Sequence, residues 1–156
     1  NLSVWRKVFQ LNLEVGIILN NIFIPSMIRK KWGRICHISS ISALENQGTP
    51  PYCSAKSAVN AYVRSVGRYL SSKKIVMTAV MPGPILTKNG YWDIKGKKEP
   101  KSVKKYLDER VAIKRFGNEQ EISDFVIFLT SQKSSFAAGS CFLVDGGQGR
   151  SFYPTF

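Results

Sequence analysis

The chain has 156 residues, the length of one ordinary domain or of a piece of a larger one. With 44% hydrophobic and 21% charged residues, its composition is that of a packed protein, which excludes collagen-like, low-complexity and disordered classes. The chain has 23 basic and only 10 acidic residues, so its net charge is +13 and anionic partners have to be considered.

The first thirty residues predict one long helix. Apolar side chains recur at helical spacing from Leu2 to Lys31 and are dense enough for the helix to be largely buried. Pro25 lacks an amide hydrogen, so it should kink or restart this helix. The most apolar part, Val15 to Ile28, contains two asparagines and is too short to cross a bilayer comfortably. No membrane span is therefore expected.

Strands and helices alternate through the rest of the chain. The expected strands are Arg34–Ser39, Ile75–Val80 and Cys141–Val144, and the expected helices are Tyr52–Ser71 and Glu119–Ser131. Such alternation predicts an α/β fold with a parallel sheet covered on both faces. Three strands make a small sheet, so we expect an incomplete one whose remaining strands lie upstream. The chain begins with Asn1 rather than Met, and it shows no signal peptide.

A lysine-rich stretch interrupts this alternation. Between Lys88 and Arg115 there are ten basic and four acidic side chains. We expect a mobile loop there, with one short helix near Ser102 to Glu109.

The ends of the three strands predict where a ligand binds. In open parallel sheets, ligands bind beyond the carboxyl ends of the strands. Those ends carry Ser39-Ser40, Pro82-Gly83 and Asp145-Gly146-Gly147, all polar or glycine-rich. Three such exits should meet at one edge of the sheet.

Two side chains near these exits could move a proton. Tyr52 and Lys56 are four residues apart on a predicted helix, so they lie on one face. A phenol with an ordinary pKa near 10 needs a neighbouring cation or helix N-terminus to act near neutral pH. The pattern alone is weak, because one chance match among six tyrosines in a lysine-rich chain would be unsurprising.

Two further polar residues strengthen this pattern. Ser40 lies twelve residues before Tyr52 and could share a substrate oxygen with it, although it could also be a turn serine that bonds its own backbone. Asn12, inside an apolar helix, needs a partner for its amide, and it could simply be a satisfied core asparagine.

In order and approximate spacing, Asn12, Ser40, Tyr52 and Lys56 match the catalytic tetrad of the short-chain dehydrogenase/reductase family, which the chain resembles. Other segments along nearly the whole chain also resemble family motifs. These are Gly33 to Ser40, Tyr52 to Asn60, Pro82 to Thr87, Arg115 to Gly117 and Val144 to Gly147.

The resemblance implies hydride transfer between NAD or NADP and a carbonyl or alcohol substrate, such as a 3-oxoacyl thioester, a sugar or another ketone. Tyr52 would then be the general acid, and Ser40 would hold the carbonyl oxygen. Lys56 would favour the phenolate and bind the nicotinamide ribose, while Asn12 would hold a water in the proton relay. Charge developing on the oxygen would be stabilised by these donors.

The resemblance also assigns contacts to the cofactor and the substrate. Besides Tyr52 and Lys56, the cofactor-binding residues would be Pro82, Gly83, Ile85 and Thr87. Ser42 and Trp92 would contact the substrate. No metal site is expected, because Cys36, Cys53 and Cys141 lack ligand spacing; reduced thiols in a cytoplasmic protein fit them best.

In fold, the resemblance implies a Rossmann-like, doubly wound parallel sheet that is incomplete. Residues 1–156 would form the catalytic C-terminal portion of one such domain, without the family's glycine-rich pyrophosphate turn. The choice between NAD and NADP would lie in that other portion. Family members commonly pair through helices like Leu2–Lys31 and Tyr52–Ser71, so a homodimer or homotetramer is expected.

Two alternatives stay open at this level. The chain could be an inactive remnant, or an interaction module that binds an anionic partner through its basic surface. A nucleic-acid platform would need lysines and aromatic residues interleaved on one surface. Here the lysine pairs are scattered, so no nucleic-acid partner is expected.

Overall fold

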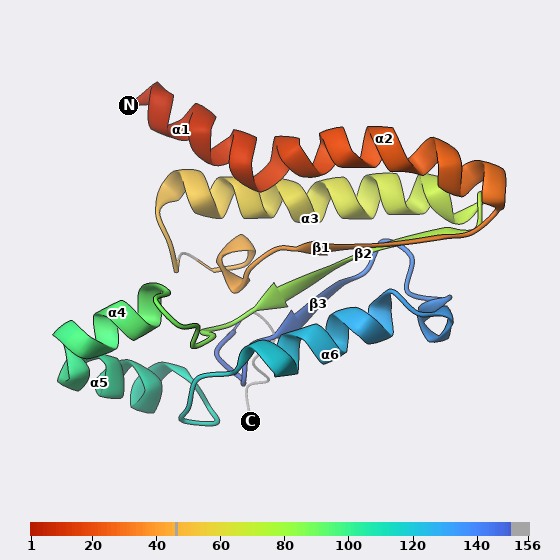
Figure 1. Ribbon diagram of the computed structural model, residues 1–156. Helices are drawn as coiled ribbons and strands as arrows, with labels where there is room; N and C mark the ends of the chain where they lie inside the picture. The colour runs from red at the N-terminus through yellow and green to blue at the C-terminus, as the bar shows by residue number, and fades with distance from the viewer. Residues whose placement is uncertain (46, 151–156) are drawn as a thin grey trace.

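The computed structural model describes residues 1–45 and 47–150, and its centre is a sheet of three parallel strands (Figure 1). In spatial order these are β1 (Gly33–Ile38), β2 (Ile75–Pro82) and β3 (Cys141–Val144). In the register of the sheet, Gly33 lies opposite Ile75, and Ala79 lies opposite Cys141. The three predicted strands are confirmed, with β1 starting one residue earlier and β2 continuing to Pro82. Residues 151–156 of the proposed 1–156 domain lie outside the described residues.

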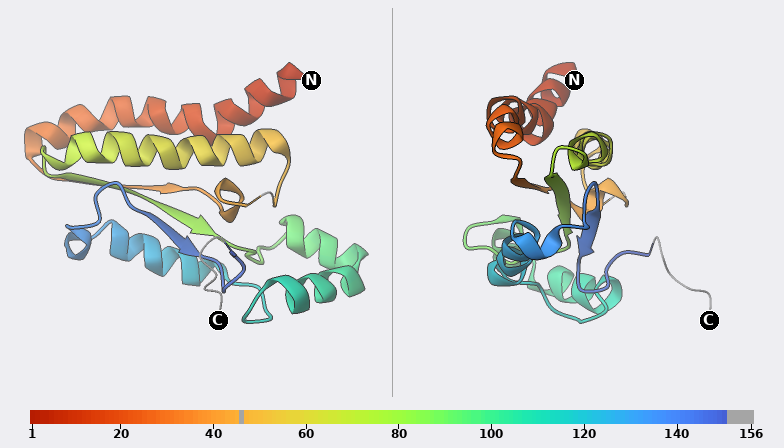
Figure 2. Two further views of the ribbon diagram at one scale, coloured as in Figure 1. Left: turned by 180° about the vertical axis from the view of Figure 1, so that it is seen from behind. Right: turned by 90° about the vertical axis from the view of Figure 1, so that its right-hand side faces the viewer.

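Helices cover both faces of this sheet. On one face lie α2 (Val15–Lys30) and α3 (Pro50–Ser71), and on the other lies α6 (Glu119–Leu129), as Figures 1 and 2 show. The buried core joins α3 to β2 through Val59, Val63, Leu70, Ile75, Met77 and Ala79. The predicted α/β class with a parallel, doubly covered sheet is therefore confirmed.

The helix α3 begins two residues before its predicted start. Pro50 and Pro51 occupy the first turn, where a missing amide hydrogen costs no helical hydrogen bond. This places Tyr52 in the first turn of α3, close to the carboxyl end of the sheet.

The N-terminal helical run is irregular at a different place from the one predicted. It consists of α1 (Leu2–Phe9), a π-helical turn (Gln10–Glu14) and α2 without a break. Of the two outcomes expected at Pro25, a restart is wrong, because α2 continues through that residue, and a kink stays a prediction. Pro25 is exposed, so water can satisfy the carbonyl that its missing amide leaves free.

The expectation that this run is largely buried is also wrong. Asn20 is the one buried residue in these three segments. The run contacts α3 and β1 along one side, and nothing in the described structure covers the apolar side chains that face away. Those that are exposed include Leu11, Val15, Ile18, Leu19, Ile22 and Phe23.

The run Leu2–Lys30 is long and apolar enough, by length and composition alone, to span a membrane. It has 29 residues and a mean hydropathy of 1.4 over its most apolar window. The stretch Val15–Ile28, which is too short on its own to cross a bilayer comfortably, is thus only part of a longer apolar helical run. Its packing against α3 and β1 makes it part of the helical layer on the sheet (Figure 1).

The lysine-rich stretch forms two helices rather than a mobile loop. They are α4 (Tyr91–Lys98), which was not predicted, and α5 (Pro100–Arg110), which is longer than expected. The carboxylate of Asp93 pairs with Lys97 at 2.8 Å within α4. Both helices lie beyond the carboxyl ends of the strands (Figure 1).

Candidate active site

The three strand exits meet, as their sequences predict. At the end of β2, the amide of Gly83 donates to the carbonyl of Val144 at 3.0 Å. A Cβ atom on Gly83 would lie only 2.6 Å from Cα of Asp145, so no other residue fits there without a shift. On the opposite side of β2, the amide of Ser39 donates to the carbonyl of Val80 at 2.7 Å.

An open cleft of about 760 Å³ lies at these exits. Its size is that of a small-molecule binding site. One wall comes from the exit of β1 and the start of α3, and the other comes from α4 and α5. The lining residues include Ser40, Ser42, Tyr52, Gly83, Tyr91, Trp92, Lys95, Tyr106 and Gln148.

Ser40 combines the two roles that its sequence left open. Its Oγ accepts a hydrogen bond from the amide of Ser42 at 3.1 Å and so caps the 3-10 helix Ile41–Ala43. The same hydroxyl lines the cleft, where its hydrogen is available to a ligand. Ser42 is buried and also lines the cleft.

Lys56 lies below Tyr52 on the same face of α3, as their spacing predicts. Its Nζ is 5.6 Å from the centre of the Tyr52 ring and donates to the carbonyl of Ile38 at 2.8 Å. Only 8% of Lys56 is exposed, and burial lowers the pKa of its ammonium group. One donor of the ammonium is fixed to the strand, which leaves two for other partners.

Comparison with known proteins identifies this arrangement. Residues 1–148 match a family described as enoyl-(acyl carrier protein) reductase, within the short-chain dehydrogenases. The chain belongs to the short-chain dehydrogenase/reductase family. The resemblance inferred from the tetrad and its flanking motifs is thereby confirmed.

Named relatives agree with this assignment. Over 144 residues the chain is 35% identical to the 3-oxoacyl-[acyl-carrier-protein] reductase FabG of Buchnera aphidicola subsp. Acyrthosiphon pisum, covering 92% of this chain and 57% of the relative. The L-sorbose reductase of Gluconobacter frateurii, solved with NADPH and L-sorbose, has a TM-score of 0.84 at 27% identity. That match covers 96% of this chain and 60% of the reductase.

A third relative shares the fold. The 3-oxoacyl-[acyl-carrier protein] reductase of Brucella melitensis, solved with bound NAD, has a TM-score of 0.85 at 24% identity. The match covers 97% of this chain and 54% of that enzyme. The chain thus spans little more than half the length of the short-chain dehydrogenases it matches.

The fourth member of the predicted tetrad lies apart from the cleft wall. Asn12 is in the π-helical turn, and its Nδ2 donates to the carbonyl of Val8 at 2.9 Å. Val8 lines the cleft, whereas Asn12 does not. A polar residue in an apolar helix was the one sequence feature that pointed to this π turn. Such turns recur at functional sites.

The predicted cofactor residues form the loop after β2. Pro82 ends that strand, and the chain then pairs with Gly117 through the carbonyl of Pro84 and the amide of Leu86. Because neighbouring residues of an extended chain point their backbone groups in opposite directions, Ile85 directs its own N–H and C=O away from Gly117. Within residues 1–45 and 47–150, neither group has a backbone partner.

This free donor and acceptor complement a primary amide, which is the group that a nicotinamide carries. The residues therefore fit a nicotinamide at this loop. Thr87 follows two residues later, and its carbonyl accepts from the amide of Gly90 at 2.9 Å.

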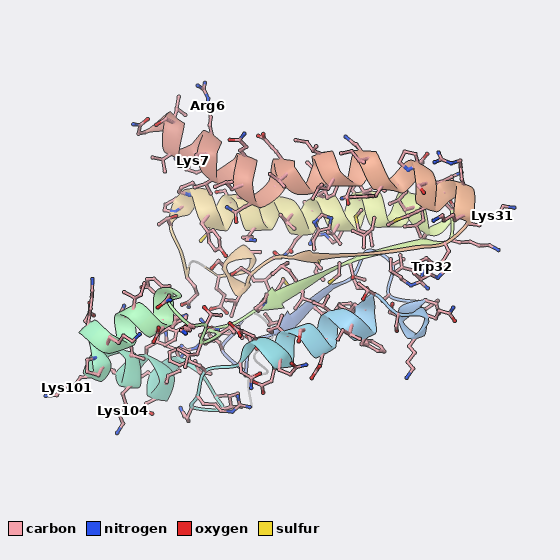
Figure 3. The ribbon with its side chains drawn as sticks, in the orientation of Figure 1. Arg6, Lys7, Lys31, Trp32, Lys101 and Lys104 are labelled. Atoms are coloured by element: carbon pink, nitrogen blue, oxygen red, sulfur yellow. The ribbon has the colours of Figure 1, made fainter. Side chains whose placement is uncertain are left out.

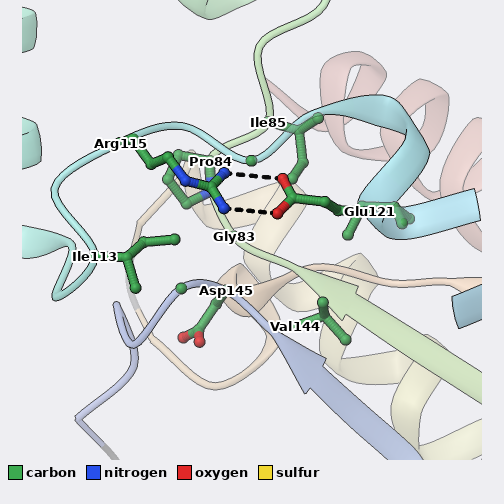
Figure 4. A pocket seen from close by; sticks show the side chains of 11 residues that line it. Gly83, Pro84, Ile85, Ile113, Arg115, Glu121, Val144 and Asp145 are labelled. Carbon is green, nitrogen blue, oxygen red and sulfur yellow. Dashed lines mark hydrogen bonds and ion pairs between the residues drawn. The ribbon is translucent and has the colours of Figure 1, made fainter. Parts of the chain in front are cut away.

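A smaller pocket of about 140 Å³ lies behind the same loop (Figure 4). Beside it, Arg115 makes two hydrogen bonds to Glu121, at 2.7 and 3.0 Å. The Arg115 guanidinium lowers the pKa of Glu121 to about 2, and the amide of Asn118 adds to this effect. Glu121 also completes a capping box with Asn118 at the start of α6. These contacts hold the start of α6 to the segment that directly precedes it, a role that the sequence did not reveal.

Trp92 lies at the centre of an aromatic cluster on the α4–α5 wall. Its ring centre is 4.4 Å from that of Tyr106, 5.0 Å from Tyr91 and 5.3 Å from Phe116. Trp92 therefore packs its own helices together and also lines the cleft. Lys95 and Gln148 line the cleft as well, and sequence reasoning missed both.

A polar cluster between α2, α3 and β1 was also missed. Nδ2 of the buried Asn20 lies 2.9 Å from Nε2 of His37 and donates to the Tyr62 hydroxyl at 3.0 Å. Burial lowers the pKa of His37, and the positive charge of Lys56 lowers it further. A neutral imidazole that accepts from Asn20 fits this surrounding, so His37 serves packing beneath the site.

Proposed function

We propose that the protein containing this chain is an NAD(P)-dependent oxidoreductase that interconverts a carbonyl compound and its alcohol. The observation that carries the proposal is the placement of Ser40 and Tyr52 on one cleft with the Lys56 ammonium below the phenol. Relatives named for the reduction of 3-oxoacyl thioesters and of a sugar support a carbonyl or alcohol substrate.

In the reducing direction, the substrate oxygen lies between Ser40 and Tyr52. The Ser40 hydroxyl donates a hydrogen bond to that oxygen, and Tyr52 transfers its phenolic proton to it as the carbonyl becomes an alkoxide. Lys56 stabilises the negative charge left on the phenol oxygen. Its bond to Ile38 keeps the ammonium in place during this transfer. Oxidation of the alcohol reverses each of these roles.

NAD or NADP, when bound, supplies or accepts the hydride. We propose that the free N–H and C=O of Ile85, with Thr87, hold the carboxamide, and that Pro82 and Gly83 form the surface on which the ring rests. Two donors of Lys56 and the Tyr52 hydroxyl remain for ribose hydroxyls. Because one relative was solved with NADPH and another with NAD, the proposal includes both cofactors.

Asn12, Ser42 and Trp92 complete the proposed site. Asn12 would hold a water that carries protons between Lys56 and solvent, since the bond to Val8 leaves its amide oxygen free to accept. Ser42 and Trp92 would contact the substrate from opposite walls of the cleft.

The assembly that we propose is a homodimer or homotetramer in the cytoplasm. Its support is the row of exposed apolar side chains on α1 and α2, which would make a large wet patch on a monomer. Cys36, Cys53 and Cys141 are free thiols, as a reducing compartment would keep them. The proposal includes no membrane or nucleic-acid partner.

The test is a Tyr52→Phe variant of the gene product that contains this chain. We expect turnover to fall about a hundredfold or more, because the proton donor is lost, while nicotinamide binding stays nearly unchanged. Nicotinamide absorbance with a panel of ketones measures turnover, and calorimetry measures binding. Tyr69→Phe, on an exposed position of the same helix, is the matched control.

Retained turnover in Tyr52→Phe would remove this residue from the mechanism. No nicotinamide-dependent turnover in the parent protein would instead favour the inactive remnant. Neither the matched family nor the named relatives support the alternative of an anion-binding interaction module.

A further inference from the structure

One charged side chain lines the cleft among the residues that the structure describes. It is Lys95, which reaches the cleft from α4, while Ser40, just after β1, and Tyr52, in α3, border the cleft on its other side. The other lining residues are uncharged, so Lys95 is the charged group that a ligand in the cleft can contact on the α4–α5 wall.

Lys95 is held over aromatic rings. Its Nζ lies 5.7 Å from the centre of the Tyr91 ring and 6.0 Å from that of Trp92, and it donates to the Tyr91 hydroxyl at 3.4 Å. These contacts orient the ammonium but do not neutralise it. The side chain is half-buried and therefore has lost part of its hydration.

No carboxylate of the described part of the chain pairs with Lys95. Its neighbour Lys97 is paired with Asp93, and farther along Lys105 approaches Glu109 at 3.8 Å. A partly dehydrated cation beside a ligand cleft gains most from an anion that the ligand brings.

The remaining lysines of α4 and α5 lie outside the cleft. Figure 3 shows Lys101 and Lys104 pointing away from the sheet and from the cleft. They add positive potential around the entrance, and none of them lines the cleft. An acidic macromolecule would meet these outer lysines first, whereas a small anion inside the cleft would meet Lys95.

We propose that the substrate is a small oxo or hydroxy acid whose carboxylate pairs with Lys95 while its carbonyl or alcohol carbon lies at Ser40 and Tyr52. The inference rests on the proposed oxidoreductase function and adds the class of its substrate. A cleft of about 760 Å³ has room for such a compound and a nicotinamide end beside it.

The experiment uses three oxo acids and their methyl esters with the gene product that contains this chain. Pyruvate, acetoacetate and levulinate place the carboxylate at increasing distances from the carbonyl, and each ester keeps the carbonyl but removes the charge. For the acid of matching length, we expect kcat/KM to exceed that of its ester by about tenfold or more, as a charged hydrogen bond provides.

Lys95→Met should remove this preference by lowering kcat/KM for the matching acid to about that of its ester. Lys95→Arg should retain most of it, because the positive charge remains. The matched control is Lys104→Met, which removes one charge from the outer surface of α5 and should leave the preference unchanged.

Fluorescence of Trp92, next to Lys95, gives a readout that does not need turnover. The acids should bind more tightly than their esters, and the Lys95→Met variant should bind both with equal affinity. The Trp92→Phe variant should lose the fluorescence change, which shows that the change comes from Trp92. Equal binding of acids and esters to the parent protein, or a preference that survives in Lys95→Met, would overturn the inference.

The two proposals fail in different ways. Tyr52-dependent turnover of acids and esters alike, with no effect of Lys95→Met, would leave the oxidoreductase function intact and exclude this substrate class. Absence of any Tyr52-dependent turnover would contradict the oxidoreductase function, and the binding comparison would still decide the role of Lys95. Inhibition by poly-L-glutamate without any acid preference would assign the basic surface to an acidic macromolecule and contradict the inference.

Discussion

Replacing Gly83 by alanine tests whether the active cleft depends on the close approach of two strand exits. The added Cβ would lie 2.6 Å from Cα and 2.8 Å from the carbonyl oxygen of Asp145, whereas ordinary contacts begin at 3.4 Å. Both neighbours are backbone atoms, so the strand exits themselves must separate by about 0.8 Å. Forcing an extra methyl group into a packed region costs about 1–3 kcal/mol.

The control is the same substitution at Gly96, in α4. Apart from the neighbouring backbone of its own helix, no atom lies within 4 Å of the position where its Cβ would be. Alanine should therefore stabilise the helix by about 0.5–1 kcal/mol, through helix propensity and a less flexible unfolded state. The free energies of unfolding of the two variants should differ by about 1.5–4 kcal/mol, as the sum of these opposite effects.

Urea unfolding of the gene product, followed by circular dichroism, measures this difference. Turnover is the second readout, since a shift near 1 Å in a reacting group can cost about a hundredfold in rate. If Gly83→Ala proved as stable and as active as Gly96→Ala, the close contact of β2 and β3 at the site would be refuted.

Two further predictions concern assembly and acid stability. Ile22, 62% exposed on α2, should be covered by a second copy, so Ile22→Glu should yield monomers in light scattering; Ile127→Glu, at a position 64% exposed on α6, should assemble like the parent. An Ile22→Glu variant that keeps the parent's mass would exclude α2 from the interface. The pKa of Glu121 falls from 4.5 to about 2 in the folded state, so its contribution to stability is complete above pH 4.5 and is lost as the pH falls towards 2. Glu121→Gln should flatten the decline of stability over that range in acid unfolding, whereas Glu119→Gln, with no ion pair in the described structure, should follow the parent curve.

The elements that the sequence predicted well are those with a strong local signal. The strand Cys141–Val144 has the predicted bounds, and α6 starts at the predicted Glu119, where Asn118 and Glu121 form a capping box. Short apolar runs bounded by glycine or proline, and capped helix starts, depend on neighbours in the sequence. Distant contacts therefore changed them little.

The burial of apolar side chains was predicted less well, because it depends on which other element of the fold covers them. The periodicity of Leu2–Lys30 shows which residues are apolar but not which element covers them. In the structure, α3 and β1 cover one side and leave Ile18 and Phe23 exposed. The π turn at Gln10–Glu14 likewise had no local signal, since its five residues would suit an ordinary helix.

The residues of the site also differ in how well the sequence predicts them, because some depend on local signals and others on tertiary packing. Ser40, Tyr52 and Lys56 could be predicted because two of them share a helix and the third ends an adjacent strand. On the opposite wall, Trp92 was predicted only through the family resemblance and Lys95 was missed, because these side chains meet Ser40 only through the packing of α4 and α5 beyond the sheet (Figure 1). The proposed proton-transfer groups thus stand on the sheet and α3, while the proposed substrate contacts stand on a separate pair of helices. Substitutions in that pair should change which substrate is accepted and leave the proton transfer at Tyr52 intact.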